Sequence, residues 1–136
     1  MREIKFRGKR LDNGEWVIGS YIEAENRDLS IAHQIVPYES GEAVREVDPA
    51  TVGQFTGLKD KNGRDIWEGD ILKSARDGRL YVVKFWSGMF YASVEECNKG
   101  IFGGFPLHAL TENEESGYEC DIIGNIHDNP ELLKTE

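Results

Sequence analysis

Short segments in which apolar and polar residues alternate constrain the fold of this chain more than any other feature of its sequence. In residues 3–9, EIKFRGK, Ile4 and Phe6 alternate with charged residues, which is typical of a β-strand with one buried face. Further strand-like segments, separated by turn residues, are expected at 15–24, 28–38, 40–47, 71–74 and 79–94. Asp48-Pro49 and Asn129-Pro130 each resemble a cap followed by a first helical residue. The sequence therefore predicts an all-β chain with one or two short helical turns.

Two turns are expected from Asn-Gly pairs. Asn13 and Gly14 both tolerate the positive φ of a type I′ turn, which would place Leu11 opposite Trp16. The second pair, Asn62-Gly63, lies in the central stretch TGLKDKNGRDIWEGDIL, residues 56–72. Both pairs therefore predict hairpins.

The register of the second hairpin follows from its charges. A two-residue loop would set Lys61 opposite Arg64 and Asp60 opposite Asp65, and like charges in these positions destabilise a sheet. A three-residue loop pairs Asp60 with Arg64 instead and places Gly63 at the left-handed position of a bulge. The bulged hairpin is therefore the prediction.

A metal site in the central stretch fails on spacing, and a general acid/base pair of Glu68 and Asp70 would need a cleft and a perturbed pKa that the sequence does not show. An EF-hand loop needs glycine at its sixth position and an acid at its twelfth, whereas counting from Asp60 gives Gly63 at the fourth and Ile71 at the twelfth. Turn residues explain the stretch better, since short polar side chains cap backbone amides and glycines reverse the chain. Structural turn roles are accordingly assigned to Asn13, Gly14, Asp60, Asn62, Gly63, Gly69 and Asp70.

Other candidates for chemistry are equally unspecific. The histidines and cysteines lack the short paired spacing of a zinc site, and no serine or cysteine lies in a nucleophile elbow. These residues are His33, Cys97, His108, Cys120 and His127. We therefore expect no catalytic, cofactor-binding or metal-binding residue and no enzymatic activity.

Aromatic residues dominate the region after the central stretch. A two-residue loop at Ser87-Gly88 would set Trp86 opposite Met89 and Phe85 opposite Phe90, and we expect these side chains to form part of the core. The segment KGIFGGFP, residues 99–106, is expected to be a glycine-rich loop. Its Phe102 and Phe105 would plug the end of a barrel or form a subunit contact.

Charge is distributed unevenly along the chain. The net charge is −9, yet residues 1–10 carry five bases against Glu3, and from Thr111 onward eight acids face Lys134. A basic start and an acidic end favour head-to-tail contact, while the alternative is that both are solvated surfaces. We expect a homo-oligomer in which Ile4–Lys9 is an edge strand that contributes to the contact.

The same basic strand supports a second function. Alternation places Lys5, Arg7 and Lys9 on one strand face, where they could bind a nucleic acid, although the acidity of the rest of the chain opposes this. No apolar run approaches the roughly 20 residues that span a bilayer, and the N-terminus lacks the apolar region of a signal peptide. We therefore expect a cytoplasmic protein without a membrane partner.

Three blocks carry a family resemblance: IKFRGKR, TVGQFTGLKDKNGRDIWEGDIL and IIGNIHDNPELL. In this order they resemble the YopX family of small phage and prophage proteins. The resemblance implies an N-terminal β subdomain, assigned to residues 1–52, and a C-terminal SH3-like barrel with a final helical turn, assigned to residues 53–136. The strand and turn order from Ile66 to Ile126 is also typical of such barrels.

The resemblance implies no activity and supplies no catalytic residues. The expected function is a phage or prophage accessory protein of the bacterial host cytoplasm. It would be a non-enzymatic module for protein interaction or assembly, with a host or phage protein as partner. The alternative is a nucleic-acid-binding protein that uses the basic N-terminal strand.

Overall fold

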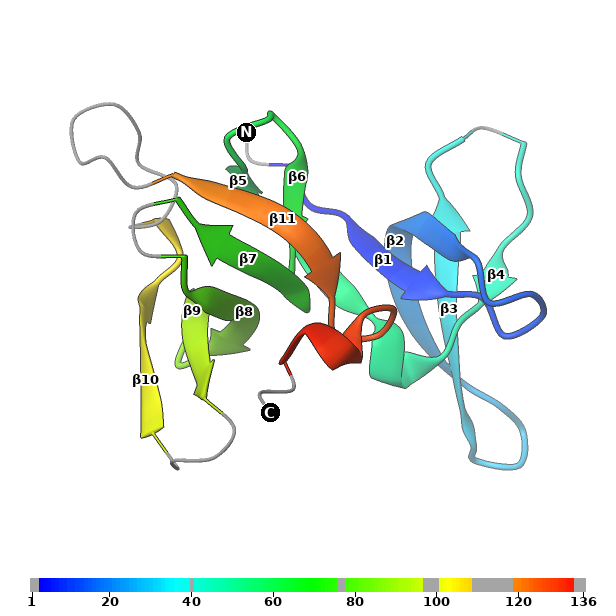
Figure 1. Cartoon of the computed structure of the whole chain (residues 1–136). Coiled ribbons are helices and arrows are strands. Elements are labelled where there is room, and N and C mark those ends of the chain that lie inside the picture. The colour runs from blue at the N-terminus through cyan, green and yellow to red at the C-terminus, as the bar shows by residue number, and fades with distance from the viewer. Residues whose placement is uncertain (1–2, 40, 76–77, 97–100, 109–118, 134–136) are drawn as a thin grey trace. The chain divides into compact units, whose positions relative to one another are not determined.

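The computed structural model describes residues 3–39, 41–75, 78–96, 101–108 and 119–133 (Figure 1). In residues 95–96, 101–103 and 105 it describes the backbone alone. The described part contains eleven strands and two short 3-10 helices, so the chain is all-β. It divides into two compact units, Met1–Phe55 and Thr56–Glu136.

The first unit is a sheet of antiparallel strands. Its elements are β1 (Phe6–Lys9), β2 (Trp16–Glu25), β3 (Ile31–Pro37), β4 (Arg45–Glu46), the helix η1 (Pro49–Thr51) and the start of β5 (Gly53–Lys59). The strand order is β4-β3-β2-β1-β5, and β5 continues into the second unit, where β6 pairs with it. Asp48 caps η1 by accepting a hydrogen bond from the Ala50 amide, as the sequence predicts.

The core of the first unit forms where β1 crosses β3 and the segment before η1. Ile35 and Val47 are fully buried. An ideal Cβ on Gly8 would lie 3.1 Å from the Val47 Cβ and 3.2 Å from the Ile35 Cδ1. Glycine in β1 therefore lets these two side chains approach the backbone closely.

Strand β1 lies inside the sheet and not at its edge, so the expected edge strand is wrong. Residues 6–9 pair with β2, and Phe6 and Arg7 also pair with Gln54 and Gly53 of β5. Before the strand, the Lys5 carbonyl accepts a hydrogen bond from the Phe55 amide at 2.9 Å. Because β1 has strands on both sides, it cannot recruit another chain through backbone pairing.

The turn at Asn13-Gly14 also differs from the two-residue hairpin. Arg10 donates its amide to the Glu15 carbonyl, and Lys9 lies opposite Trp16, so the loop spans four residues. A two-residue loop would have set Asp12 opposite Glu15, two like charges. In the longer loop the Arg10 guanidinium binds both oxygens of Asp12, at 2.9 and 2.6 Å.

The second unit contains a five-stranded antiparallel sheet in the order β10-β9-β8-β7-β11. After β6 (Asp65–Trp67) its elements are β7 (Asp70–Ser74), β8 (Leu80–Trp86), β9 (Met89–Glu96), β10 (Ile101–Pro106), β11 (Cys120–Asn125) and the helix η2 (Pro130–Leu133). Its core cluster consists of Ile66, Leu72, Tyr81, Val83, Ala92, Leu107 and Cys120. Among the described residues no pairing closes this sheet, so the SH3-like barrel stays a prediction.

The expected glycine-rich loop is wrong, because most of it forms strand β10. This strand pairs with β9 from Ile101↔Glu96 to Pro106↔Tyr91. An ideal Cβ on Gly104 would lie 2.3 Å from the Ala92 carbonyl oxygen and 2.5 Å from the Tyr91 ring. The absence of a side chain at Gly104 therefore makes room for the aromatic ring of the neighbouring strand.

The helices of the described residues are short. The Leu132 amide donates to the Asn129 carbonyl at 3.1 Å, so η2 begins where the sequence predicts a helical turn. In this part of the chain, none of the helices has the length and apolar character that crossing a membrane requires.

Candidate interaction surface

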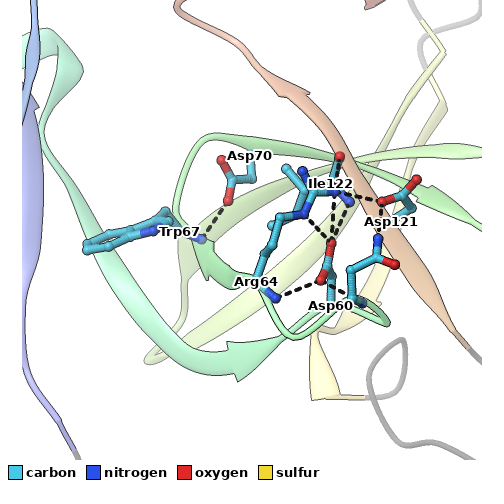
Figure 2. A network of polar contacts seen from close by, with 7 residues as sticks. Asp60, Arg64, Trp67, Asp70, Asp121 and Ile122 are labelled. Carbon is cyan, nitrogen blue, oxygen red and sulfur yellow. Dashed lines mark hydrogen bonds and ion pairs between the residues drawn. The ribbon is translucent and has the colours of Figure 1, made fainter.

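The central hairpin, residues 60–64, has the three-residue loop (Figure 2). The Asp60 amide donates to the Arg64 carbonyl at 2.9 Å, and the Gly63 amide donates to the Asp60 carbonyl at 3.0 Å. Gly63 has a φ of 79°, the left-handed conformation that favours glycine. The charge argument thus gives the register that the structure has.

Asp60 holds this hairpin through a buried carboxylate. Its Oδ1 accepts hydrogen bonds from the Asn62 and Arg64 amides, both at 2.9 Å, while its Oδ2 accepts from the Arg64 Nε at 3.1 Å and the Ile122 amide at 3.2 Å. Burial by itself raises the pKa of this carboxyl group. The amide donors and the charge of Arg64 outweigh burial, so the pKa lies below its usual value.

Arg64 extends the network to strand β11. Its guanidinium donates to the Asp121 carboxylate at 2.7 Å and to the Ile122 carbonyl at 2.6 Å. The Asn62 side chain donates to the same Asp121 oxygen at 3.0 Å. Figure 2 shows Asp60 and Arg64 beside Asp121 and Ile122 of β11, so the network ties two segments far apart in sequence.

Asp70 also serves the backbone. Its carboxylate accepts the Trp67 amide at 2.7 Å, and the side chain is buried. Gly69 between them has a φ of 93°, which makes the turn. The turn residues of the central stretch therefore lie where they stabilise the backbone.

The structure places Lys5, just before β1, and the two cations of β1 over aromatic rings. The Lys5 ammonium lies 4.5 Å from the centroid of the Phe55 ring, and its side chain is only 12% exposed. The Arg7 guanidinium carbon lies 4.6 Å and the Lys9 ammonium 5.4 Å from the centroid of Trp16. These half-buried cations do not form an open basic surface.

A groove of about 470 Å³ lies in the first unit. Residues that line it include Arg10, Trp16, Ile18, Tyr38, Glu42 and Arg45. Its two arginines already have carboxylate partners, since Arg10 binds Asp12 and Arg45 lies 3.4 Å from Glu42. The groove is therefore lined by both positive and negative side chains, and its lining does not indicate one class of ligand.

The hairpin of β8 and β9 has the predicted register, but only Phe90 packs against the core cluster as expected. The expectation is wrong for the other three residues, which are exposed at the tip of the hairpin. Trp86 lies opposite Met89 and Phe85 opposite Phe90. Phe85 is 53% exposed and Trp86 69%, and Met89 is also exposed. We call the four residues Phe85, Trp86, Met89 and Phe90 the aromatic tip.

The aromatic tip is ordered by contacts between its rings and with the neighbouring ring of Tyr91. Phe85 and Phe90 meet edge to face with centroids 5.2 Å apart, and Trp86 lies 6.4 Å from Tyr91. Ser87 and Gly88 both have positive φ, 52° and 79°, as a two-residue hairpin loop requires. The tip therefore presents a fixed apolar surface.

The absence of charged side chains sets the segment around the aromatic tip apart from the rest of the chain. Residues 85–94 contain no charged side chain, whereas 30% of all residues are charged. The sequence did carry a signal for exposure, because adjacent aromatics such as Phe85 and Trp86 point to opposite faces of a strand. At the end of a hairpin, both faces cannot reach one core.

The other candidate residues do not gather into a site. The side chains of Phe102 and Phe105 lie outside the described part, as does Cys97. Cys120 is buried, and burial, with a smaller contribution from Asp60, raises the pKa of its thiol to about 11. Within the described residues, no three His, Cys, Asp or Glu side chains are grouped as a metal site requires.

Comparisons with known proteins agree with the sequence blocks. The structure is similar to the crystal structure of protein EF1440 from Enterococcus faecalis, with a TM-score of 0.53 and 24% identity. The likeness covers 98% of this chain and all of that one, and it shows the fold alone. The comparison with curated proteins gives no significant match. The family model described as "YopX protein" matches residues 5–134, nearly the whole chain, and this chain therefore belongs to the YopX family.

Proposed function

We propose that this protein is a non-enzymatic interaction module that binds another protein through the aromatic tip. The exposure of Phe85, Trp86 and Met89 in one uncharged segment carries the proposal. Exposed apolar surface of this kind marks contact sites in soluble proteins. Because a short loop and ring contacts fix the tip, a partner would not have to order it on binding.

The chemistry of the tip suits a protein partner. Tryptophan is among the residues that dominate binding energy when a partner surrounds it, and truncation of such a residue costs about 2 kcal/mol or more. Methionine beside the rings adapts to irregular apolar surfaces. An apolar patch on the partner, free of negative charge at its rim, would match this surface.

The buried acids argue for structure and against catalysis. Asp60 accepts amide hydrogen bonds from both sides of its loop, and Asp70 accepts one from Trp67. Their lone pairs are used to hold turns. We therefore assign these carboxylates no part in a reaction.

Nucleic-acid binding remains the second candidate, with less support. Aromatic side chains can stack on bases, but the segment 85–94 has no cation to bind phosphate and the chain carries a net charge of −9. Lys5 and Lys9 lie over aromatic rings. The geometry favours the protein partner.

The family resemblance supplies the proposed context. We infer that the protein acts as a phage or prophage accessory protein in the cytoplasm of a bacterial host. Its partner would be a host or phage protein, or a second copy of the chain. Binding to any of these partners would require neither a cofactor nor a membrane.

Affinity purification with a tip variant tests the function. Tagged protein is expressed in bacteria that carry the phage, beside Trp86→Ser and the control Leu11→Ser, which removes an exposed apolar side chain from the first unit. We expect one protein to copurify with the original chain and with Leu11→Ser but not with Trp86→Ser. Equal recovery with all three, although all three melt alike, would contradict the proposal.

A further inference from the structure

Strand β2 is much longer than the strand beside it. It runs from Trp16 to Glu25, but β1 pairs with it only as far as Gly19. On the other side of β2, every residue of β3 pairs with it, from Pro37↔Gly19 to Ile31↔Glu25. Residues 20–25 of β2, the loop 26–30 and residues 31–36 of β3 thus form an extension beyond the end of β1, which we call the arm (Figure 1).

The hydrogen-bond pattern shows which backbone groups of the arm lack a strand partner. The Ile18 carbonyl accepts the Tyr38 amide, and the Asn26 amide donates to the Ser30 carbonyl, so even-numbered residues of β2 face β3. The amides and carbonyls of odd-numbered residues therefore face the opposite side. Beyond Gly19, no described strand pairs with that side, so the groups of Tyr21, Glu23 and Glu25 form an open edge.

Side chains beside the open edge alternate in character. Glu23 and Glu25 are exposed on one face, while Ile22, 42% exposed, lies on the other. The Tyr21 hydroxyl donates to Glu23 at 3.0 Å and also contacts the Nδ1 of His33 across the arm. These contacts hold a carboxylate in place next to the edge.

We propose that the open edge of the arm binds an extended segment of a partner protein as an added β-strand, and that this segment alternates basic and apolar residues. Backbone hydrogen bonds to Tyr21, Glu23 and Glu25 supply the pairing. Basic side chains lie opposite Glu23 and Glu25, and apolar ones cover Ile22 and Ala24 on the other face. This site lies in the first unit and is independent of the aromatic tip.

A second copy fits this edge less well than a basic segment does. Two arms paired edge to edge would bring glutamates of one copy opposite glutamates of the other, and like charges directly opposite destabilise a sheet. Glutamates at alternate positions guard an edge against such pairing. They also select a partner that carries the opposite charge.

A labelled peptide tests the proposal directly. The probe is a short fluorescein-labelled peptide of alternating lysine and valine, titrated with the full chain and followed by anisotropy. We expect it to bind at least about tenfold more tightly than a peptide of the same composition with its lysines in one block. A peptide of alternating glutamate and valine should not bind. Absence of binding by the alternating lysine peptide would overturn the proposal.

Variants at one position separate backbone pairing from charge. Glu23→Pro removes an amide that faces the open edge but none that faces β3, and it should weaken binding at least about tenfold. Glu23→Gln keeps that amide and should weaken binding about two- to fivefold. Glu131→Gln, an exposed acid of the other unit, should change nothing. If Glu131→Gln and Glu23→Gln weakened binding equally, the peptide would be attracted only by the net charge of the protein. That result would overturn the proposal.

Amide exchange locates the peptide. With the probe bound, we expect the amides of Tyr21, Glu23 and Glu25 to gain protection from hydrogen exchange, while those of Ile22 and Ala24, already bonded to β3, change little. Protection elsewhere, with none at these three residues, would overturn the proposal. Trp86→Ser should bind the peptide unchanged, so this test does not depend on the proposed function.

Discussion

At the residue scale, Asp60 shows how one buried carboxylate can organise a turn. Its two oxygens accept the Asn62, Arg64 and Ile122 amides and the Arg64 side chain. The Asp60 side chain is fully buried, whereas the Arg64 side chain is half exposed. Loss of the carboxylate would leave three amides without an acceptor, and a buried donor without a partner costs about 1–3 kcal/mol.

Asp60→Ala should therefore lower the free energy of unfolding by about 2–4 kcal/mol. Asp12→Ala is a matched control, because it removes an Asp–Arg pair with two short hydrogen bonds that lies at the surface. Exposed pairs contribute little to stability, because solvent screens their charges, so the control should change the free energy of unfolding much less. Urea unfolding measures both variants. Equal effects would mean that the network of Asp60 adds nothing beyond a surface pair.

The lowered pKa of Asp60 predicts how stability depends on pH. The folded protein holds the carboxylate more firmly deprotonated than the unfolded chain does, so its contribution is fully present above the unfolded pKa of about 4. That contribution is lost as pH falls through the lower folded pKa. The stability difference between the original chain and Asp60→Asn should therefore shrink below about pH 4. A difference that stays constant down to pH 2.5 would contradict this assignment.

Gly63 is required for its backbone conformation and not for space. Its φ is 79°, and an ideal Cβ there meets no atom within 4 Å. Gly63→Val should destabilise the protein by more than about 1 kcal/mol, because β-branched residues are strained at positive φ. Gly63→Asn should cost less, since asparagine tolerates this conformation. Equal melting temperatures for the two variants would contradict the argument.

At the element scale, the β9–β10 ladder depends on Gly104 for room. A methyl group there would clash with the Ala92 carbonyl and the Tyr91 ring. Gly104→Ala should therefore lower the free energy of unfolding by about 1–3 kcal/mol. In a double-mutant cycle, Tyr91→Ala should relieve only the part that comes from the ring. Purely additive effects would show that the ring does not oppose residue 104.

Local charges were enough to predict some elements and not others. The register of the hairpin at residues 60–64 follows from pairing Asp60 with Arg64, because both alternatives can be compared within one turn. The same comparison at residues 10–15 would have disfavoured a loop that sets Asp12 opposite Glu15. The sequence therefore carried the information for both turns, but Asn13-Gly14 alone was a misleading signal.

Local sequence patterns could not predict contacts between residues that lie far apart in the chain. Strand β10 pairs with β9, where Gly104 leaves room for the Tyr91 ring, and the position of β1 inside the sheet depends on pairing with Gly53 and Gln54 of β5, far along the chain. The aromatic tip shows the same limit, since period-2 alternation predicts a strand but not where its core ends. Nor could spacing predict that Arg64 reaches Asp121 across 57 residues of chain.

At the scale of the whole molecule, the interior position of β1 changes the expected mode of self-association. Backbone pairing through Ile4–Lys9 is not available to a second copy, because β1 has neighbours on both sides. Two chains that each carry a charge of −9 repel one another over most of their surfaces. The uncharged aromatic tip is a surface at which that repulsion is weak, so we place the proposed homo-oligomer contact there.

A contact at the aromatic tip should depend on salt in the opposite way to a head-to-tail contact between charged segments. If opposite charges held the copies together, added salt would screen the attraction and dissociate them. An apolar contact between like-charged copies should strengthen with salt, because the Debye length falls from about 10 Å at 0.1 M to about 3 Å at 1 M while apolar burial is little changed. Light scattering should therefore show more dimer as ionic strength rises, and Trp86→Ser should stay monomeric throughout. If added salt dissociated the dimer, or if Trp86→Ser still dimerised, the charged segments and not the aromatic tip would form the contact.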